Sequence, residues 1–509
     1  MMNTKLRIIA MIAIVLMLAV ILLPVVRPAQ ASADLGRQTQ TPSYDALDAY
    51  IEGQMKALNV PGASLVVVEG DQIVHTKGFG TTGPGGSTPT PQTPFFIGSL
   101  TKSFTSLAVM QLVEEGKVDL DAPIQQYLPW FTLADADAAS RITVRQLMIQ
   151  TSGISQIPGM IGLANFDDSA DEGERQVRGL SDSIPSHQPG ETWEYSNVNF
   201  NLLGLIVETV SGESYSEYVQ NHIFTPLDMQ HSYTSKEEAQ QDGLITGNQQ
   251  WFGFPVAVPD QRVPVASLPS GQLIASAEDM AHYLIAQLNQ GEMQGVSVLS
   301  GEGMDLMHQP AASVSLGDGA MGYYGMGWFV NEIKGQNIVY HYGEVPDFFA
   351  YMALLPDQDR AIVLLFNTNE QLYTYALLSA SEAAALSLAG VAPEANNWPV
   401  MPWALRAALL LPVLQVVLIA VSARRLKTKR MASFRRPVRT RVWVLQLALP
   451  ILLNLILVAI PVAVMASGLF KFLMLFMGDL LSIFVLMGII ALIWIVVRTT
   501  MIVREYQSS

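Results

Sequence analysis

Residues 97–104 read Ile97-Gly98-Ser99-Leu100-Thr101-Lys102-Ser103-Phe104, and this stretch contains a Ser-x-x-Lys motif. The apolar run that follows, Leu107 to Val113, predicts a helix that ends at Gly116. Ser99 then lies in the first turn, where the helix dipole favours negative charge on its oxygen. Lys102 shares its helix face, and a lysine desolvated by apolar neighbours has a lowered pKa and can accept the serine's proton. The stretch predicts a nucleophile beside its base, although a chance Ser-x-x-Lys is common enough that other motifs must support it.

The composition indicates a globular part combined with membrane segments. The chain has 509 residues, of which 50% are hydrophobic and only 14% charged, so two or three units are expected. It contains no cysteine, which excludes disulfides, thiolate zinc sites and cysteine nucleophiles. Acidic residues are concentrated in residues 32–397, and an acidic globular part repels nucleic acid. Nucleic acid is therefore not an expected partner.

The N-terminal segment, residues 1–31, has the pattern of an export signal. Lys5 and Arg7 precede an apolar run from Ile8 to Val26, and Ala29-Gln30-Ala31 provides small residues for cleavage. The apolar run is long enough that an uncleaved anchor is the alternative. Either form predicts that the domain after it is exported, with residues 32–44 as a linker.

Residues 45–390 are expected to form one α+β domain, an antiparallel sheet flanked by helices with a mostly helical section in the middle. Apolar periodicity predicts a helix over Ser43–Leu58 and another over Leu372–Leu388. Strands are predicted at both ends of this region, so its two ends should pair in one sheet. The predicted strands are Ala63–Glu69, Gln72–Gly78, Gly325–Val330, Ile338–His341, Phe348–Leu355 and Ala361–Asn367.

After a linker at residues 391–402, residues 403–509 are expected to form a membrane tail. Three apolar runs are each near the length that a bilayer requires: Trp403–Ala423, Val442–Ala466 and Leu480–Val497. The loop at residues 424–441 is rich in Arg and Lys, which predicts that it is cytoplasmic. The first run then leads from outside to inside, which agrees with an extracytoplasmic domain before it.

Two further short motifs lie in the globular part, Tyr195-x-Asn197 in a predicted loop and His341-x-Gly343 on a predicted strand. In this order after Ser-x-x-Lys, they resemble the penicillin-recognising serine hydrolases. The similarity is to the branch of class C β-lactamases, D-alanyl-D-alanine carboxypeptidases and related esterases. Several other segments also resemble family landmarks: Val60-Pro61-Gly62, residues 147–153, Pro189-Gly190, residues 226–229, residues 276–279 and residues 324–328.

The resemblance implies a β-lactamase/transpeptidase-like fold and a role for each matching residue. Ser99 would be the nucleophile, Lys102 its base, and Tyr195 the phenol that moves protons between serine, lysine and leaving group. Asn197 would hold the substrate's amide or orient Lys102, and His341 would hydrogen-bond Tyr195 or a substrate carboxylate.

The resemblance further implies an oxyanion hole on the strand that follows Gly343. It would consist of the backbone N–H groups of Ser99 and Glu344, and losing one such donor typically costs about 2.7–4 kcal/mol of transition-state stabilisation. The chain departs from the family pattern at Gln150, Glu344 and Asp347. These departures leave the nucleophile in place and bear on the class of substrate.

The sequence favours a membrane-anchored, extracytoplasmic serine hydrolase that acts through an acyl-enzyme on esters or D-amino-acid amides or peptides. Its partners would be such a small molecule or peptide, for example a cell-wall peptide, and the bilayer. No cofactor or metal is expected, because the histidines form no metal-binding spacing. The alternative is a module that binds or senses a β-lactam or cell-wall peptide without efficient turnover.

Overall fold

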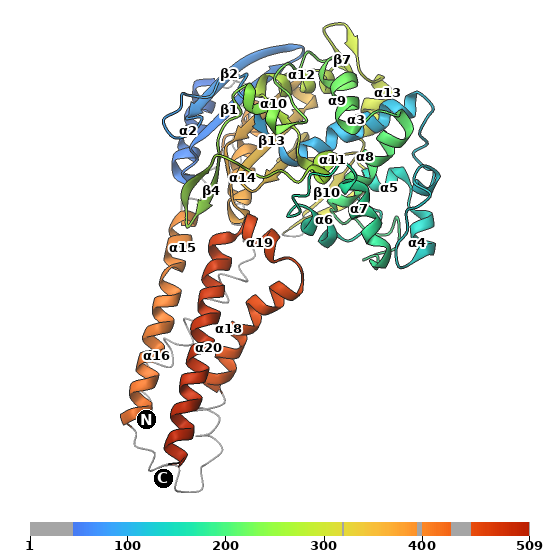
Figure 1. The fold of residues 1–509 in the computed structure, drawn as a ribbon. Coiled ribbons are helices and arrows are strands. Elements are labelled where there is room, and N and C mark those ends of the chain that lie inside the picture. The colour runs from blue at the N-terminus through green and yellow to red at the C-terminus, as the bar shows by residue number, and fades with distance from the viewer. Residues whose placement is uncertain (1–43, 318–319, 394–399, 429–448, 508–509) are drawn as a thin grey trace.

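The computed structural model describes residues 44–317, 320–393, 400–428 and 449–507 (Figure 1). The predicted signal at 1–31, nearly all of the 32–44 linker, part of the 391–402 linker and most of the basic loop at 424–441 lie outside these residues. A globular part is followed by long helices that extend away from it.

The globular part is built on an eight-stranded antiparallel sheet with the order β2-β1-β14-β13-β12-β11-β10-β9. Its strands are β1 Gly62–Glu69, β2 Gln72–Gly80, β9 Ala312–Gly317, β10 Ala320–Tyr324, β11 Phe329–Ile333, β12 Gln336–Val345, β13 Phe348–Leu355 and β14 Arg360–Phe366. Because β1 pairs with β14, the two ends of the domain close the sheet, which confirms the predicted arrangement.

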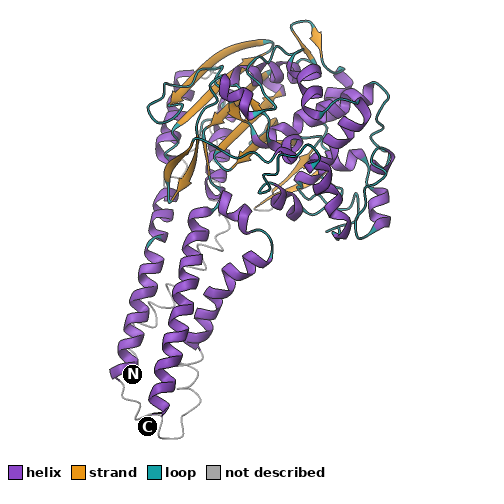
Figure 2. Ribbon diagram, viewed as in Figure 1, coloured by secondary structure: helices purple, strands orange, loops and turns teal. Residues whose placement is uncertain are grey.

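Helices cover both faces of the sheet (Figure 2). In β1, Leu65 and Val67 pack into the apolar cluster formed with α2 (Tyr44–Leu58) and α14 (Gln371–Leu388), whereas Val66 and Val68 pack into the opposite cluster. Successive strand residues point to opposite faces, so a strand covered on both sides needs a continuous apolar run. β13 is buried along its whole length for this reason.

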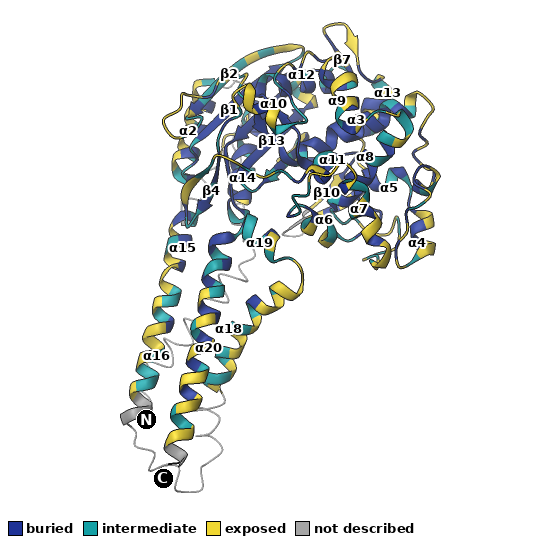
Figure 3. Cartoon of the chain, in the orientation of Figure 1, coloured by how far each residue is buried: buried dark blue, intermediate teal, exposed yellow. Residues whose placement is uncertain are grey.

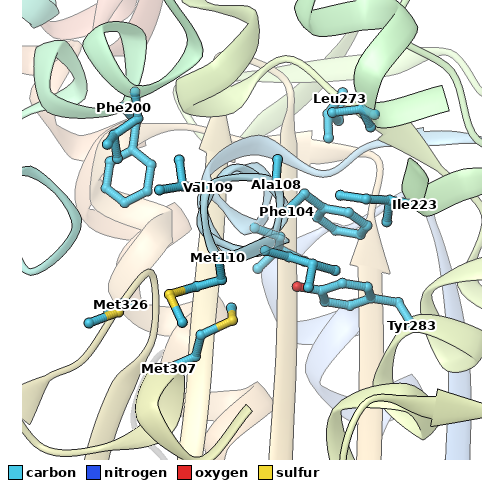
Figure 4. Packing of buried hydrophobic residues seen from close by; sticks show 14 of the residues in the cluster. Phe104, Ala108, Val109, Met110, Phe200, Ile223, Leu273, Tyr283, Met307 and Met326 are labelled. Carbon is cyan, nitrogen blue, oxygen red and sulfur yellow. The ribbon is translucent and has the colours of Figure 1, made fainter. Parts of the chain in front are cut away.

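Helix α3 (Thr101–Glu114) lies at the centre of the helical section. Its residues from Thr101 to Met110 are all buried, including Lys102. Figure 4 shows Phe104, Val109 and Met110 of this helix packed among side chains from surrounding elements. The other helices of this section are α4 Ala136–Arg141, α5 Val144–Met148, α6 Gln156–Gly162, α7 Glu172–Arg178, α8 Asn197–Ser211, α9 Tyr215–Val219, α10 Lys236–Gln241, α11 Leu268–Gly271, α12 Ala277–Leu288 and α13 Gly301–His308.

Two segments differ from the sequence prediction. Residues 325–328, expected within one strand, form a turn between β10 and β11. Gly327 has a φ of +81°, and a Cβ there would lie 2.9 Å from the carbonyl oxygen of Lys102, so the close approach to α3 replaces the strand. The middle section also contains a hairpin, β4 (Gly247–Trp251) and β5 (Phe254–Val258), where mainly helices were expected.

Three helices are long and apolar enough to cross a membrane: Met401–Arg424, Leu449–Ala466 and Gly478–Arg504. They confirm the three predicted spans. The third helix, Gly478–Arg504, is longer than the apolar run Leu480–Val497 from which it was predicted. The tail helices are α15 Val400–Ala408, α16 Leu410–Thr428, α18 Leu449–Ala466, α19 Phe470–Phe476 and α20 Gly478–Gln507. Exposed apolar side chains line these helices, as expected of surfaces that face lipid (Figure 3).

Candidate active site

The Ser-x-x-Lys motif begins in a single 3-10 turn, Gly98–Leu100, that leads directly into α3. Gly98 has a φ of +54°, and a Cβ at this position would lie 2.5 Å from the backbone nitrogen of Glu344. Only glycine permits both this conformation and this contact. The turn leaves Ser99 partly exposed, whereas Lys102, one helical turn later, is fully buried.

The Lys102 ammonium group has three close partners. Its Nζ lies 2.9 Å from Ser99 Oγ, 2.8 Å from Asn197 Oδ1 and 2.6 Å from the backbone oxygen of Ser270. Burial holds the pKa of Lys102 well below its usual range, and the charge of Glu344 opposes that shift only in part.

A neutral amine at this position has two N–H groups and one lone pair. The Asn197 and Ser270 oxygens can only accept hydrogen bonds, so they take the two N–H groups. The lone pair then faces the Ser99 hydroxyl, which can donate its proton to Lys102. The arrangement is therefore that of a serine beside a general base.

Tyr195 lies over the same lysine, with Lys102 Nζ 4.8 Å from the centre of its ring. Burial raises the pKa of Tyr195 well above its usual range, and hydrogen bonding with Ser99 opposes the shift. Its phenol therefore remains protonated and can donate a hydrogen bond at neutral pH.

Gln150 supports the loop that carries Tyr195. Its side-chain oxygen accepts from the backbone N–H of Ser196 at 3.0 Å, and its backbone oxygen accepts from that of Glu194 at 2.9 Å. The departure from the family pattern at this position thus serves to hold the loop, with Gln150 itself fully buried.

The edge of β12 lies against the turn that carries Ser99. β11 pairs with β12 only as far as Tyr340, which leaves the following residues free to approach the turn. A Cβ at Gly343 would lie 2.0 Å from the backbone oxygen of Ile97 and 2.9 Å from the nitrogen of Ser99. The two donors of the predicted oxyanion hole, on Ser99 and Glu344, are therefore carried by two backbone segments in direct contact.

His341 is buried, and its hydrogen bonds are to Tyr324 and Tyr342, whereas the resemblance implied a bond to Tyr195 or to a substrate carboxylate. Its Nε2 accepts from the Tyr324 hydroxyl at 3.2 Å, and its Nδ1 donates to the backbone oxygen of Tyr342 at 2.7 Å. The ring centres of His341 and Tyr195 are 6.4 Å apart. Burial, assisted by the charge of Lys102, lowers the pKa of His341 to about 3, so this imidazole is neutral at pH 7.

The two acidic departures from the family pattern occupy different surroundings. Burial raises the pKa of Glu344 to about 7, while hydrogen bonding with Thr374 and the charge of Lys102 act in the opposite direction. Asp347 is buried against Gly247 of β4, and burial raises its pKa to about 8. Glu344 therefore acts on the electrostatics around Lys102, whereas Asp347 belongs to the packing between the β12–β13 turn and β4.

Sequence reasoning predicted no site role for the Ser270 carbonyl, for Thr374 or for Tyr324, although Tyr324 opens one of the segments that resemble family landmarks. A backbone carbonyl carries no side-chain signal, and the two side chains act through contacts between distant segments. Across the described ranges, no group of three or more His, Cys, Asp or Glu side chains is arranged to hold a metal ion.

The family model described as Beta-lactamase matches residues 47–385. Protein flp of Staphylococcus aureus (strain MW2) is 30% identical over 333 residues, which cover 65% of this chain and 64% of flp. Penicillin-binding protein 4 of Amycolatopsis lactamdurans is 30% identical over 321 residues, or 61% of this chain and 81% of that protein. The match to flp thus spans less than two thirds of flp's own length.

Solved structures give the same result for the fold. The octameric penicillin-binding protein homologue from Pyrococcus abyssi has a TM-score of 0.60 and 29% identity, covering 69% of this chain and 79% of that one. A D-stereospecific amidohydrolase from Streptomyces sp. has a TM-score of 0.53 and 24% identity, covering 64% and 94%, and this likeness concerns the fold alone. With a family match over most of its globular part, the chain belongs to the beta-lactamase family, extended by a tail of three apolar helices.

Proposed function

We propose that the chain is a membrane-anchored serine hydrolase that acts through an acyl-enzyme on esters or D-amino-acid amides or peptides. The observation that carries this proposal is the position of Lys102 Nζ, 2.9 Å from Ser99 Oγ and held by two other acceptors. The boundaries proposed for the hydrolase domain are residues 45–390.

In the acylation step, Ser99 Oγ bonds to the substrate's carbonyl carbon while its proton passes to Lys102 Nζ. The backbone N–H groups of Ser99 and Glu344 stabilise the negative oxygen that forms. The intermediate collapses by breaking the bond to the leaving oxygen or nitrogen, which takes a proton from the Tyr195 hydroxyl. Lys102 returns the proton to Tyr195, and water then cleaves the acyl-serine by the reverse sequence.

We further propose that the domain is extracytoplasmic and that the basic loop at 424–441 is cytoplasmic. The distribution of Arg and Lys supports this orientation.

The orientation can be tested with single introduced cysteines, because the chain has no cysteine of its own that would react in the background. In intact cells, a cysteine replacing exposed Asp71 should react with a membrane-impermeant maleimide, and one replacing Ser433 should react only after lysis. The reverse pattern would refute this orientation.

Replacing the nucleophile should abolish acylation. We expect Ser99→Ala to lose all labelling by a fluorophosphonate probe, while Ser106→Ala should keep it, because Ser106 is a buried serine of α3 with no hydrogen-bond partner among the described residues. Lys102→Ala and Tyr195→Phe should each cut turnover of a p-nitrophenyl ester by at least about 10²-fold. Persistent labelling of Ser99→Ala would exclude this nucleophile, and labelling without turnover in the wild type would favour the binding or sensing alternative.

The pH profile should depend on Glu344. Lys102 must be neutral to act as a base, so kcat/KM falls as the pH falls through the pKa of Lys102. The Glu344 carboxylate raises that pKa, so Glu344→Gln should lower it and shift the acidic limb of the profile to lower pH. Glu332→Gln, an exposed change on β11, should leave the limb in place. An unchanged or upward-shifted limb in Glu344→Gln would contradict the assigned base.

Substrate preference should favour neutral esters over β-lactams. A β-lactam carries a carboxylate, but His341 is neutral at pH 7 and offers it no positive charge, and Glu344, whose pKa is raised to about 7, is partly ionised and adds some negative charge beside it. We therefore expect kcat/KM of the wild-type chain to be higher for p-nitrophenyl acetate than for nitrocefin. The double change His341→Lys with Glu344→Gly should move the ratio toward nitrocefin. A clear wild-type preference for nitrocefin would overturn this substrate assignment.

A further inference from the structure

All three candidate spans meet the globular part directly at their near ends. Three glycines lie at these contacts, and the distance from an ideal Cβ on each glycine to the neighbouring segment shows how close the contact is. A Cβ on Gly253 would lie 2.8 Å from Pro402 Cα, one on Gly468 3.3 Å from Ile161 Cδ1, and one on Gly478 3.4 Å from the Trp251 ring. The domain is therefore held against the tail at three points.

Polar contacts secure the same junction. Arg406 donates to the Gly253 carbonyl at 2.9 Å, and the Phe252 backbone N–H donates to Asp479 Oδ2 at 2.9 Å. Gln249 donates to the Leu475 carbonyl at 2.6 Å. An apolar cluster joins α19 to the segment at and after α6, with Ala164, Phe472 and Phe476 at its centre. The tail thus holds the β4–β5 hairpin on one side and α6 on the other.

Exposed apolar side chains surround these contact points. Ile157 in α6 is 46% exposed and Phe254 in the hairpin is 53% exposed. Ile161, Val256 and Trp403 are exposed beside them. The Arg406 guanidinium lies 4.2 Å from the Phe254 ring and 4.9 Å from the Trp403 ring, so aromatic and cationic groups meet at the level where the first span begins. Figure 1 shows that α6 and β4 lie at the end of the domain that faces the tail.

We propose that this surface, defined by Ile157, Ile161, Phe254, Val256 and Trp403 and here called the basal surface, inserts into the interfacial layer of the bilayer that the three spans cross. Aromatic and basic side chains are typical of this layer, where an apolar body and a polar partner are both satisfied. The bilayer is the occupant because the basal surface is continuous with the near ends of the spans, so lipid around those ends must meet it.

The placement has a consequence for the site. A Cβ on Gly159 of α6 would lie 3.1 Å from Asn197 Cβ, and Asn197 accepts a hydrogen bond from Lys102. The catalytic lysine is thereby separated from the bilayer-facing helix by a single side chain. The basal surface itself does not depend on the proposed reaction.

The experiment uses the full chain in phosphatidylcholine vesicles that contain lipid with a doxyl spin label at carbon 5. Single cysteines replace Ile157 or Phe254 and carry an environment-sensitive fluorophore. Matched controls replace Val74 (38% exposed) on β2 and Val296 (42% exposed) on β8 (Val296–Ser297), two valines of similar exposure. Figure 1 places β2 away from the tail, and also β7 (Glu292–Met293), with which β8 pairs.

We expect several-fold stronger quenching at positions 157 and 254 than at 74 and 296, unchanged when protein is diluted with extra lipid. Equal quenching at all four positions would overturn the proposal. A second outcome would also overturn the proposal. The fluorophore at position 157 or 254 could be shielded from water without being quenched, and become exposed to water when the protein is diluted with lipid; a second copy of the chain would then cover the surface. The quenching measurement needs no enzymatic activity. An inactive chain would therefore contradict the proposed function and leave the proposal for the basal surface unaffected.

Discussion

The burial of Lys102 is the constraint on which the site depends. An isolated ammonium without compensation is too costly to bury, so the group shifts its pKa and becomes neutral. Neutrality in turn requires acceptors for both N–H groups, and these come from α8 through Asn197 and from α11 through Ser270. Helix α3 must therefore be enclosed by α8 and α11 before its lysine can serve as the proposed base.

That enclosure is possible because glycines stand at the closest contacts around α3 and the turn before it, where the backbone segments lie too near one another for a residue with a Cβ. Gly98, Gly327 and Gly343 each lie where a Cβ would be under 3.0 Å from a neighbouring segment. Two of these contacts join the turn that carries Ser99 to the edge of β12, and the third holds the β10–β11 turn against the backbone carbonyl of Lys102. The same packing that excludes water from Lys102 thus places the backbone donors beside Ser99.

Sequence patterns predicted the elements whose signal is local. The motif spacing identified Ser99, Lys102 and Asn197, which the structure brings within hydrogen-bonding distance, and Tyr195, whose ring lies over the lysine. The apolar runs predicted the sheet and the three spans. The pairing of His341 with Tyr324 was not predictable, because it depends on how far β11 extends along β12. The turn at Gly327 was missed because its contact with α3 outweighs the strand propensity of residues 325–328.

The tail contacts two elements that adjoin the site from opposite sides. On one side α19 packs on α6, which lies against Asn197. On the other, β4 pairs in parallel with Thr368 and Asn369 of β15, and Asn369 donates to the carbonyl of Val345 at the end of β12. A domain cut free of its tail would keep Ser99 in the 3-10 turn that leads into α3 and Lys102 in α3 itself. It would, however, lose the contacts of α19 with α6 and those of the tail with the β4–β5 hairpin, and these are the two elements that adjoin Asn197 and the β12 edge.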